Sequence, residues 1–224
     1  MNSPLSAIVV MGVAGCGKSC IGAAIAARSG GRLIEGDAFH PAENIRKMSA
    51  GIPLDDSDRA GWLVRLGEEL QATTQAGERP ILTCSALKRR YRDTLRDAMP
   101  GLVFVFLELS PAEAEKRVLA RPGHFMPASL IDSQFAALES PRGEPLTLAL
   151  DATQPIEALA EAVDHWLKRC GELRPSDVSA PSGSAGPSVG CRCPCPQAER
   201  PAPAQPGRSP PAVAGAPCAP EKSA

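Results

Sequence analysis

Short apolar runs alternate along the chain with longer segments whose apolar residues recur every three or four positions. The short runs predict β-strands, and the longer segments predict amphipathic helices. The predicted strands span residues 5–11, 32–35, 81–84, 102–109 and 146–150. The predicted helices span residues 18–29, 41–50, 55–75, 87–98, 111–121, 129–138 and 155–170. Strands separated by helices predict an α/β fold, with a parallel sheet of about five strands and helices on both faces.

The helix predicted over residues 55–75 shows the apolar periodicity clearly. Trp62, Leu63, Leu66 and Leu70 repeat on one face of it, which indicates core positions and not a cofactor contact. Either of the two aspartates at its start, Asp55 or Asp56, can cap its first turn.

Residues 175–224 differ in composition from the rest of the chain. They hold 12 of the 23 prolines and no aromatic residue. Such a segment buries too little apolar surface to offset its chain entropy, so it predicts a disordered tail rich in Pro, Ala and Gly. Residues 1–174 are then one folded domain.

Charge and cysteine usage narrow the class of protein. The formal net charge is −1, which lacks the basic excess of a general nucleic-acid binder. No apolar run is long enough to span a membrane, and the first residues show no basic leader. The chain has eight cysteines, but a domain of this size is stable without disulfide bonds. We therefore expect reduced thiols and a cytoplasmic protein.

A glycine-rich segment follows the first predicted strand and matches the pattern G-x-x-x-x-G-K-[ST]. The matching residues are Gly12, Val13, Ala14, Gly15, Cys16, Gly17, Lys18 and Ser19. Backbone N–H groups of such a loop, together with the helix N-terminus behind it, bind phosphate oxygens. Lys18 can reach the β- and γ-phosphates, and the Ser19 hydroxyl can ligate Mg²⁺. The segment predicts a nucleoside-triphosphate site in a P-loop NTPase sandwich of three layers.

Two thiols, Cys16 and Cys20, lie within and directly after this loop, and we count both among the ATP-binding residues. They are either inert small residues or redox sensors, because a helix N-terminus lowers the pKa of a thiol.

Two carboxylates stand at the end of the second predicted strand. Ligands of open α/β sheets bind at the carboxyl ends of the strands. Alternate residues of an extended chain face one way, so Glu35 and Asp37 are expected to point together at a metal and an acceptor. The alternative is a solvated loop that carries charges.

Several further segments of the sequence, taken together, resemble those of a known family. They read G-D-A-F-H-P (36–41), G-I-P-L-D-D-S-D-R-A-G-W-L (51–63), C-S-A-L-K-R-R-Y-R-D (84–93), R-P-G-H-F-M-P (121–127), Asn44 with Lys47 and Met48, and Gln134-Phe135 with Leu138-Glu139. With the glycine-rich loop, they make residues 6–168 resemble the gluconokinase family of small P-loop carbohydrate kinases, relatives of shikimate kinase. The resemblance implies transfer of the γ-phosphoryl group of ATP to D-gluconate, giving 6-phospho-D-gluconate.

Gluconate is a polyhydroxy carboxylate, so its site needs cations for the carboxylate and hydrogen-bonding groups for the hydroxyls. The cations that the matching segments supply are Arg59, Lys88 and Arg92, and the hydroxyl partners are Asp37, His40 and Ser85. His124 completes the expected substrate site. By resemblance, Asp37 is the base that orients or deprotonates the acceptor hydroxyl, and Arg59 holds the substrate carboxylate.

Arg117 and Arg121 are four residues apart on one predicted helix face, just before Gly123. In the family this region covers ATP as a lid, so both arginines are expected at the nucleotide and Arg121 in catalysis. The alternative is a surface pair that faces Glu113.

The chain also departs from the family pattern. Relatives often have Asp where this chain has Glu35, and no separate aspartate ends a strand as an obvious Mg²⁺ ligand. We therefore expect Mg²⁺ to be held by Ser19, phosphates and water, with the Glu35 carboxylate outside the direct ligands.

Two other functions stay open: a kinase for another hydroxy acid such as shikimate, and a nucleotide-binding regulatory module without turnover. A homodimer is possible.

Overall fold

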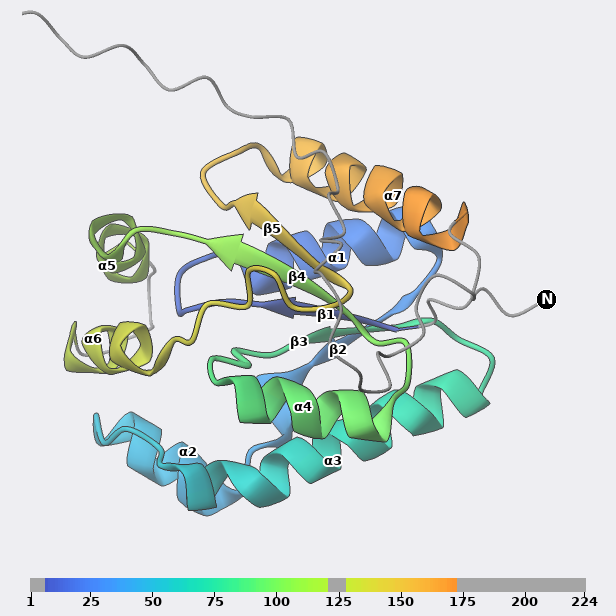
Figure 1. Ribbon diagram of the computed structural model, residues 1–224. Coiled ribbons are helices and arrows are strands. Elements are labelled where there is room, and N and C mark those ends of the chain that lie inside the picture. The colour runs from blue at the N-terminus through green and yellow to red at the C-terminus, as the bar shows by residue number, and fades with distance from the viewer. Residues whose placement is uncertain (1–6, 121–127, 173–224) are drawn as a thin grey trace, which may run out of the picture. The chain divides into compact units, whose positions relative to one another are not determined.

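The computed structural model describes residues 7–120 and 128–172. Five parallel strands form one sheet, which confirms the predicted fold class (Figure 1). The strands are β1 (Ile8–Met11), β2 (Arg32–Glu35), β3 (Pro80–Thr83), β4 (Val103–Glu108) and β5 (Thr147–Asp151). The helices are α1 (Lys18–Ser29), α2 (Ala42–Ser49), α3 (Asp56–Gln75), α4 (Arg89–Ala98), α5 (Pro111–Leu119), α6 (Ala128–Ala137) and α7 (Ile156–Glu172), with a 3₁₀ turn η1 at Gly36–Phe39.

The strand order is β2-β3-β1-β4-β5, so β1 lies in the middle of the sheet. From β1 the chain passes to β2 on one side, returns through β3, and then continues to β4 and β5 on the other side. The carboxyl ends of the strands point toward α2, α5 and α6 (Figure 1). This is the edge at which sheets of this kind bind ligands.

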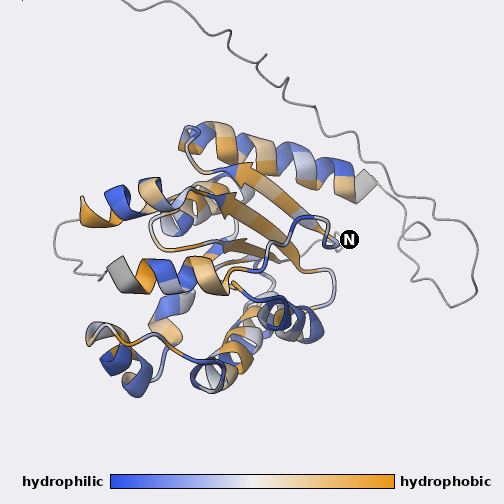
Figure 2. Cartoon of the chain, turned by 60° about the vertical axis from the view of Figure 1, so that its left-hand side comes forward, coloured by the Kyte–Doolittle hydropathy of each residue, from blue (hydrophilic) through white to orange (hydrophobic). Residues whose placement is uncertain are grey.

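Two apolar cores lie on the two faces of the sheet. Helices α3 and α4 cover one face, and α1 and α7 cover the other (Figure 1). The central strands β1, β3 and β4 are buried along almost their whole length, as expected for the middle of a sheet that is covered on both sides (Figure 2). Trp62, Leu63, Leu66 and Leu70 are all buried in the first core, which confirms their assignment as core residues.

Helix ends follow the local chemistry of the sequence. Asp55 caps α3, because its side chain accepts from the N–H of Asp58 while the Asp58 side chain accepts from the N–H of Asp55. By contrast α1 begins after Gly17, which has no side chain with which to cap the helix. The first N–H groups of α1 are therefore left for a ligand.

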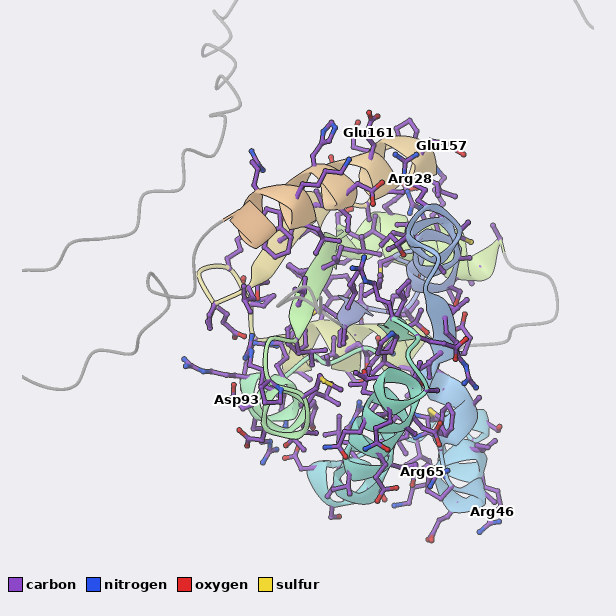
Figure 3. All side chains as sticks on the ribbon, turned by 90° about the vertical axis from the view of Figure 1, so that its right-hand side faces the viewer. Arg28, Arg46, Arg65, Asp93, Glu157 and Glu161 are labelled. Atoms are coloured by element: carbon purple, nitrogen blue, oxygen red, sulfur yellow. The ribbon has the colours of Figure 1, made fainter. Side chains whose placement is uncertain are left out.

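Charged side chains lie on the outer faces of the helices, as Figure 3 shows for Arg46, Arg65 and Asp93. One outer pair joins two helices, since Arg28 of α1 contacts Asp164 of α7 at 2.7 Å. Within the part of the chain that the structure describes, no helix is long and apolar enough to cross a membrane. The predicted tail at residues 175–224 lies outside the described residues.

Candidate active site

A cavity of about 630 Å³ lies at the carboxyl edge of the sheet. It joins the phosphate loop to the start of α1, to η1 and α2, and to the beginning of α3. The predicted site residues that line it are Ala14, Gly15, Gly17, Lys18, Ser19, Cys20, Asp37, His40, Arg59, Ser85 and Arg117. The structure thus brings together most of the predicted nucleotide-binding residues and some of the predicted substrate-binding residues.

The phosphate loop has the backbone that its glycines predict. Gly12, Gly15 and Gly17 have φ angles of +141°, +80° and +93°, which residues with a side chain rarely adopt. At Gly15 a Cβ atom would also lie 2.9 Å from the carbonyl oxygen of Ala114 in α5. The sequence can therefore curl tightly at this point, which suits a cradle for phosphates.

Lys18 folds back across this loop. Its Nζ donates to the carbonyl oxygens of Gly12 and Val13, at 3.2 and 3.1 Å. The ammonium group is thereby held over the loop, on the wall of the cavity.

Ser19 and Glu35 form a hydrogen-bonded pair beside Lys18. The Ser19 hydroxyl donates to Glu35 Oε2 at 3.0 Å, and the Thr83 hydroxyl donates to the same oxygen at 2.6 Å. A hydroxyl and a carboxylate are hard oxygen donors of the kind that Mg²⁺ prefers. These residues fit a magnesium ion that is bound mainly by nucleotide phosphates and water.

The prediction that Glu35 and Asp37 point together from an extended chain is wrong. The chain does not continue extended after β2 but turns into η1, where His40 N–H donates to the Asp37 carbonyl. Gly36 permits this turn, because a Cβ there would lie 2.4 Å from the Thr83 carbonyl oxygen. As a result Glu35 turns to Ser19 and Thr83, while Asp37 lines the cavity.

His40 follows this turn and is almost fully buried. Its ring stacks on Trp62, with 4.1 Å between ring centroids and 16° between ring planes. Burial lowers the pKa of His40, Asp37 acts in the opposite direction, and the Arg59 charge lowers it further. A pKa below the ordinary value favours the neutral form of the ring at neutral pH.

Arg59 enters the cavity from the first turn of α3. Its guanidinium donates to the Leu54 carbonyl at 3.4 and 3.3 Å and lies 5.7 Å from the centre of the Tyr91 ring. It has no carboxylate partner among the described residues, so its charge is available to an acid in the cavity.

Two of the predicted substrate cations do not line the described cavity. Arg92 is fully buried, and it donates to both Glu144 carboxylate oxygens at 2.9 and 2.5 Å and to the carbonyls of Ala86 and Leu87. Lys88 donates to Asp56 at 2.8 Å. The assignment of Arg92 to the substrate is wrong, because its side chain is fully buried and its charge is matched by Glu144. Lys88 is paired with Asp56, and its contact with the substrate stays a prediction.

Arg117 combines the two alternatives considered for it. It pairs with Glu113 at 3.2 Å and donates to the Ala152 carbonyl at 3.0 Å, and it also lines the cavity. Arg121 and His124 lie outside the described residues, so their roles stay predictions.

The two thiols at the loop differ in surroundings. Cys16 is completely buried, and burial raises its pKa even though Lys18 acts in the opposite direction. Burial and a raised pKa favour the alternative of an inert small residue at Cys16 over a redox sensor. Cys20 is exposed, and for it the hypothesis stays a prediction.

Sequence reasoning missed some cavity residues. Gln134 Oε1 accepts from the Ala14 N–H at 2.8 Å, so α6 contacts the phosphate loop. Gln134 belongs to one of the family-like segments, a signal that could have pointed to it. The other missed residues that line the cavity are Ile45, Met48, Ser49, Pro53 and Leu54, from α2 and the segment before α3, and Val118, Leu130 and Ser133, from α5 and α6.

The chain is similar over most of its length to known proteins of one family. No family model matches the chain. A gluconokinase from Gluconobacter oxydans is 45% identical over 160 residues, which cover 71% of this chain and 90% of that protein. The thermosensitive gluconokinase of Escherichia coli is 38% identical over 178 residues, covering 79% of this chain and 94% of that protein.

The fold agrees with a solved relative as well. The crystal structure of a gluconokinase from Sinorhizobium meliloti superposes with a TM-score of 0.69 at 49% identity, covering 76% of this chain and 96% of that one. The chain that carries this phosphate loop and cavity matches known gluconokinases over nearly their whole length, and the protein belongs to the gluconokinase family.

Proposed function

We propose that this protein transfers the γ-phosphoryl group of ATP to D-gluconate and releases 6-phospho-D-gluconate and ADP. One observation carries the proposal: Lys18, Asp37 and Arg59 line the same cavity. A phosphate-binding cation, a carboxylate for a hydroxyl and a cation for an acid are the groups that a sugar-acid kinase requires. The similarity to gluconokinases supports gluconate as the acid.

In this proposal Asp37 acts on the acceptor hydroxyl. The hydroxyl oxygen bonds to the γ-phosphorus while the bond from that phosphorus to the bridging oxygen breaks and ADP leaves. The hydroxyl proton passes to the Asp37 carboxylate, whose position on the cavity wall supports this role.

The cations stabilise the charge that moves during transfer. Lys18, held over the loop by two carbonyls, neutralises the β- and γ-phosphates. When bound, Mg²⁺ would supply further neutralisation of the phosphates; Ser19 would hold it, and Glu35 would act through its hydrogen bond with Ser19. Arg117 lines the cavity and is expected to contact the nucleotide.

Arg59 orients the substrate in this account. Its guanidinium, which has no carboxylate partner among the described residues, is expected to bind the gluconate carboxylate, so that the far end of the sugar acid lies at Asp37. His40 and Ser85 are expected to bind the hydroxyls between these ends. The cytoplasmic location and a possible homodimer stay predictions.

The first test is ADP release by the purified full chain with Mg-ATP. Three reactions are compared: D-gluconate, shikimate and no acceptor. Release that depends on D-gluconate supports the proposal, whereas release that gluconate does not change overturns it. Release that depends on shikimate instead would favour the other hydroxy-acid kinase.

A thermal-shift measurement separates an enzyme from a regulatory module. A gluconate kinase is stabilised further by gluconate when nucleotide is present, because a ligand that binds only the folded state raises its stability. A module without turnover would respond to nucleotide alone.

A further inference from the structure

Asn44 of α2 is a buried amide that contacts the ring of His40. Its Nδ2 lies 2.7 Å from the Asp58 carbonyl oxygen and 3.5 Å from His40 Nδ1, and its residue is 3% exposed. A backbone carbonyl oxygen only accepts hydrogen bonds. The Asn44 atom beside it is therefore the amide nitrogen, and the orientation of this amide is fixed chemically.

This orientation decides which nitrogen of His40 carries the proton. One hydrogen of the Asn44 amide goes to Asp58, and the other faces His40 Nδ1. Nδ1 must then offer a lone pair, so a neutral ring carries its hydrogen on Nε2.

The face of the His40 ring is packed against an aromatic side chain. Trp62 stacks on it, and Trp62 Nε1 itself donates to the Gly36 carbonyl at 2.9 Å. Among the described residues, no group forms a hydrogen bond with His40 Nε2. Every fully buried side-chain nitrogen or oxygen of these residues does have a hydrogen-bond partner, so Nε2 is not one of the fully buried atoms. Nε2 is thus not sealed inside the protein, and His40 lines the cavity.

We propose that Asn44 is a positioning residue that holds His40 as the neutral Nε2–H tautomer, so that the ring donates a hydrogen bond to an oxygen of the acceptor substrate. This inference rests on the proposed function for the identity of that substrate. It adds that the acceptor must present an oxygen lone pair at His40, a requirement that a hydroxyl or carboxylate oxygen meets and a C–H group does not.

Charged groups around the ring are consistent with a neutral imidazole. Asp37 and Arg59 act on it from η1 and α3 with opposite effects on its pKa, and burial disfavours its cationic form. On the Asn44 side, Lys47 and Asp58 are paired with each other at 2.5 Å. A second proton on Nδ1 would face the hydrogen of the Asn44 amide.

The direct test is ¹⁵N NMR of the histidine rings in the full chain at neutral pH. The chain has three histidines, and the His40 signals are assigned by their loss in His40→Gln. We expect an unprotonated Nδ1 and a protonated Nε2. A ring protonated on Nδ1, whether as the other tautomer or as the cation, would overturn the inference. This result does not depend on which substrate the enzyme uses.

Two variants of His40 test the donor itself in the gluconate reaction. The amide of Gln reaches the place of Nε2, whereas the shorter Asn reaches only that of Nδ1. We expect His40→Asn to raise the gluconate KM roughly tenfold more than His40→Gln, with similar ATP KM values in both. Equal gluconate KM values would contradict a donor at Nε2.

Asn44→Asp tests the positioning role. Its carboxylate accepts a hydrogen bond from Nδ1–H, so we expect the NMR signals to change to the Nδ1-protonated form and the gluconate KM to rise roughly tenfold. An unchanged wild-type tautomer in a folded Asn44→Asp protein would refute the role of Asn44. If this variant does not fold, the wild-type spectrum and the two His40 variants still decide the question.

Discussion

At the scale of single residues, the two ends of the acceptor site differ in chemistry. Asp37 is a carboxylate on the cavity wall beside the phosphate loop, and Arg59 is a cation that no described carboxylate neutralises. A substitution at each end should therefore change a different kinetic constant.

Asp37→Asn keeps the shape of the side chain but removes the base. We expect kcat to fall by about 10²- to 10⁴-fold while the ATP KM stays near that of the wild type. Steady-state kinetics with D-gluconate measure this. Near-full turnover in Asp37→Asn would remove Asp37 from the proposed mechanism.

Arg59→Ala should instead raise the gluconate KM by roughly 10- to 100-fold, because a hydrogen bond to a charged group contributes about 1.5–3 kcal/mol. Arg65→Ala is the matched control, since Arg65 lies six residues further along α3, is exposed and pairs with Glu68 and Glu69. If the gluconate KM is the same in Arg59→Ala and Arg65→Ala, Arg59 does not hold the substrate.

The sequence predicted which types of residue the site contains better than it predicted the role of each residue. Arg59 and Arg92 are chemically alike, and both belong to family-like segments. They differ because Glu144, far along the chain, folds against Arg92 and matches its charge. Such a distant partner leaves no local pattern, so the sequence could not separate a substrate cation from a structural one.

At the scale of elements, local signals predicted most of the structure. The strand β2 and the helix α1 have the predicted bounds, and other elements differ by a few residues at their ends. The 3₁₀ turn after β2 was missed because it depends on the close passage of Gly36 by the backbone of β3, which is a tertiary contact.

Two glycines of α3 give a prediction about helix packing. A Cβ at Gly61 would meet nothing within 4 Å, whereas one at Gly67 would lie 2.7 Å from the Cβ of Ala98 in α4. Gly61→Ala should stabilise the protein by about 0.5–1 kcal/mol through helix propensity. Gly67→Ala should destabilise it by about 1–3 kcal/mol, because α3 and α4 must move apart.

Urea unfolding of the two glycine variants measures this difference on a common scale. Because both substitutions have the same intrinsic propensity, their difference reports the contact with α4. Equal stabilities would mean that α3 and α4 do not pack as closely as described.

At the scale of the whole molecule, one buried ion cluster joins α4 to the segment before β5. Glu144 receives Arg92 and Arg96, and Arg96 also lies over the ring of Phe104 in β4. Burial of the carboxyl acts to raise the pKa of Glu144, but the hydrogen bonds from Arg92 and Arg96 outweigh it and lower the pKa.

Glu144→Gln should lower the free energy of unfolding at neutral pH by about 3–5 kcal/mol, because it leaves the buried Arg92 without its counter-charge. Since the pKa of Glu144 is lowered from its ordinary 4.5, its stabilisation is full above that pH and is lost as the pH falls through the folded-state pKa. The difference in free energy of unfolding between the wild type and Glu144→Gln should therefore decrease at acid pH.

Glu68→Gln is the control for this prediction, because it removes an exposed partner of Arg65 and should change stability by less than about 1 kcal/mol. Chemical unfolding of wild type and both variants at neutral and acid pH gives the comparison. A Glu144→Gln protein as stable as Glu68→Gln would contradict a structural role for the cluster.

The whole account depends on one orientation of the substrate, with its carboxylate at Arg59 and its far hydroxyl at Asp37. The most direct test is to incubate the full chain with Mg-ATP and D-gluconate and to locate the phosphoryl group in the product by NMR and mass spectrometry. The account predicts 6-phospho-D-gluconate, phosphorylated at the end of the chain opposite the carboxylate. Unmodified gluconate, or a product phosphorylated at another carbon, would contradict it.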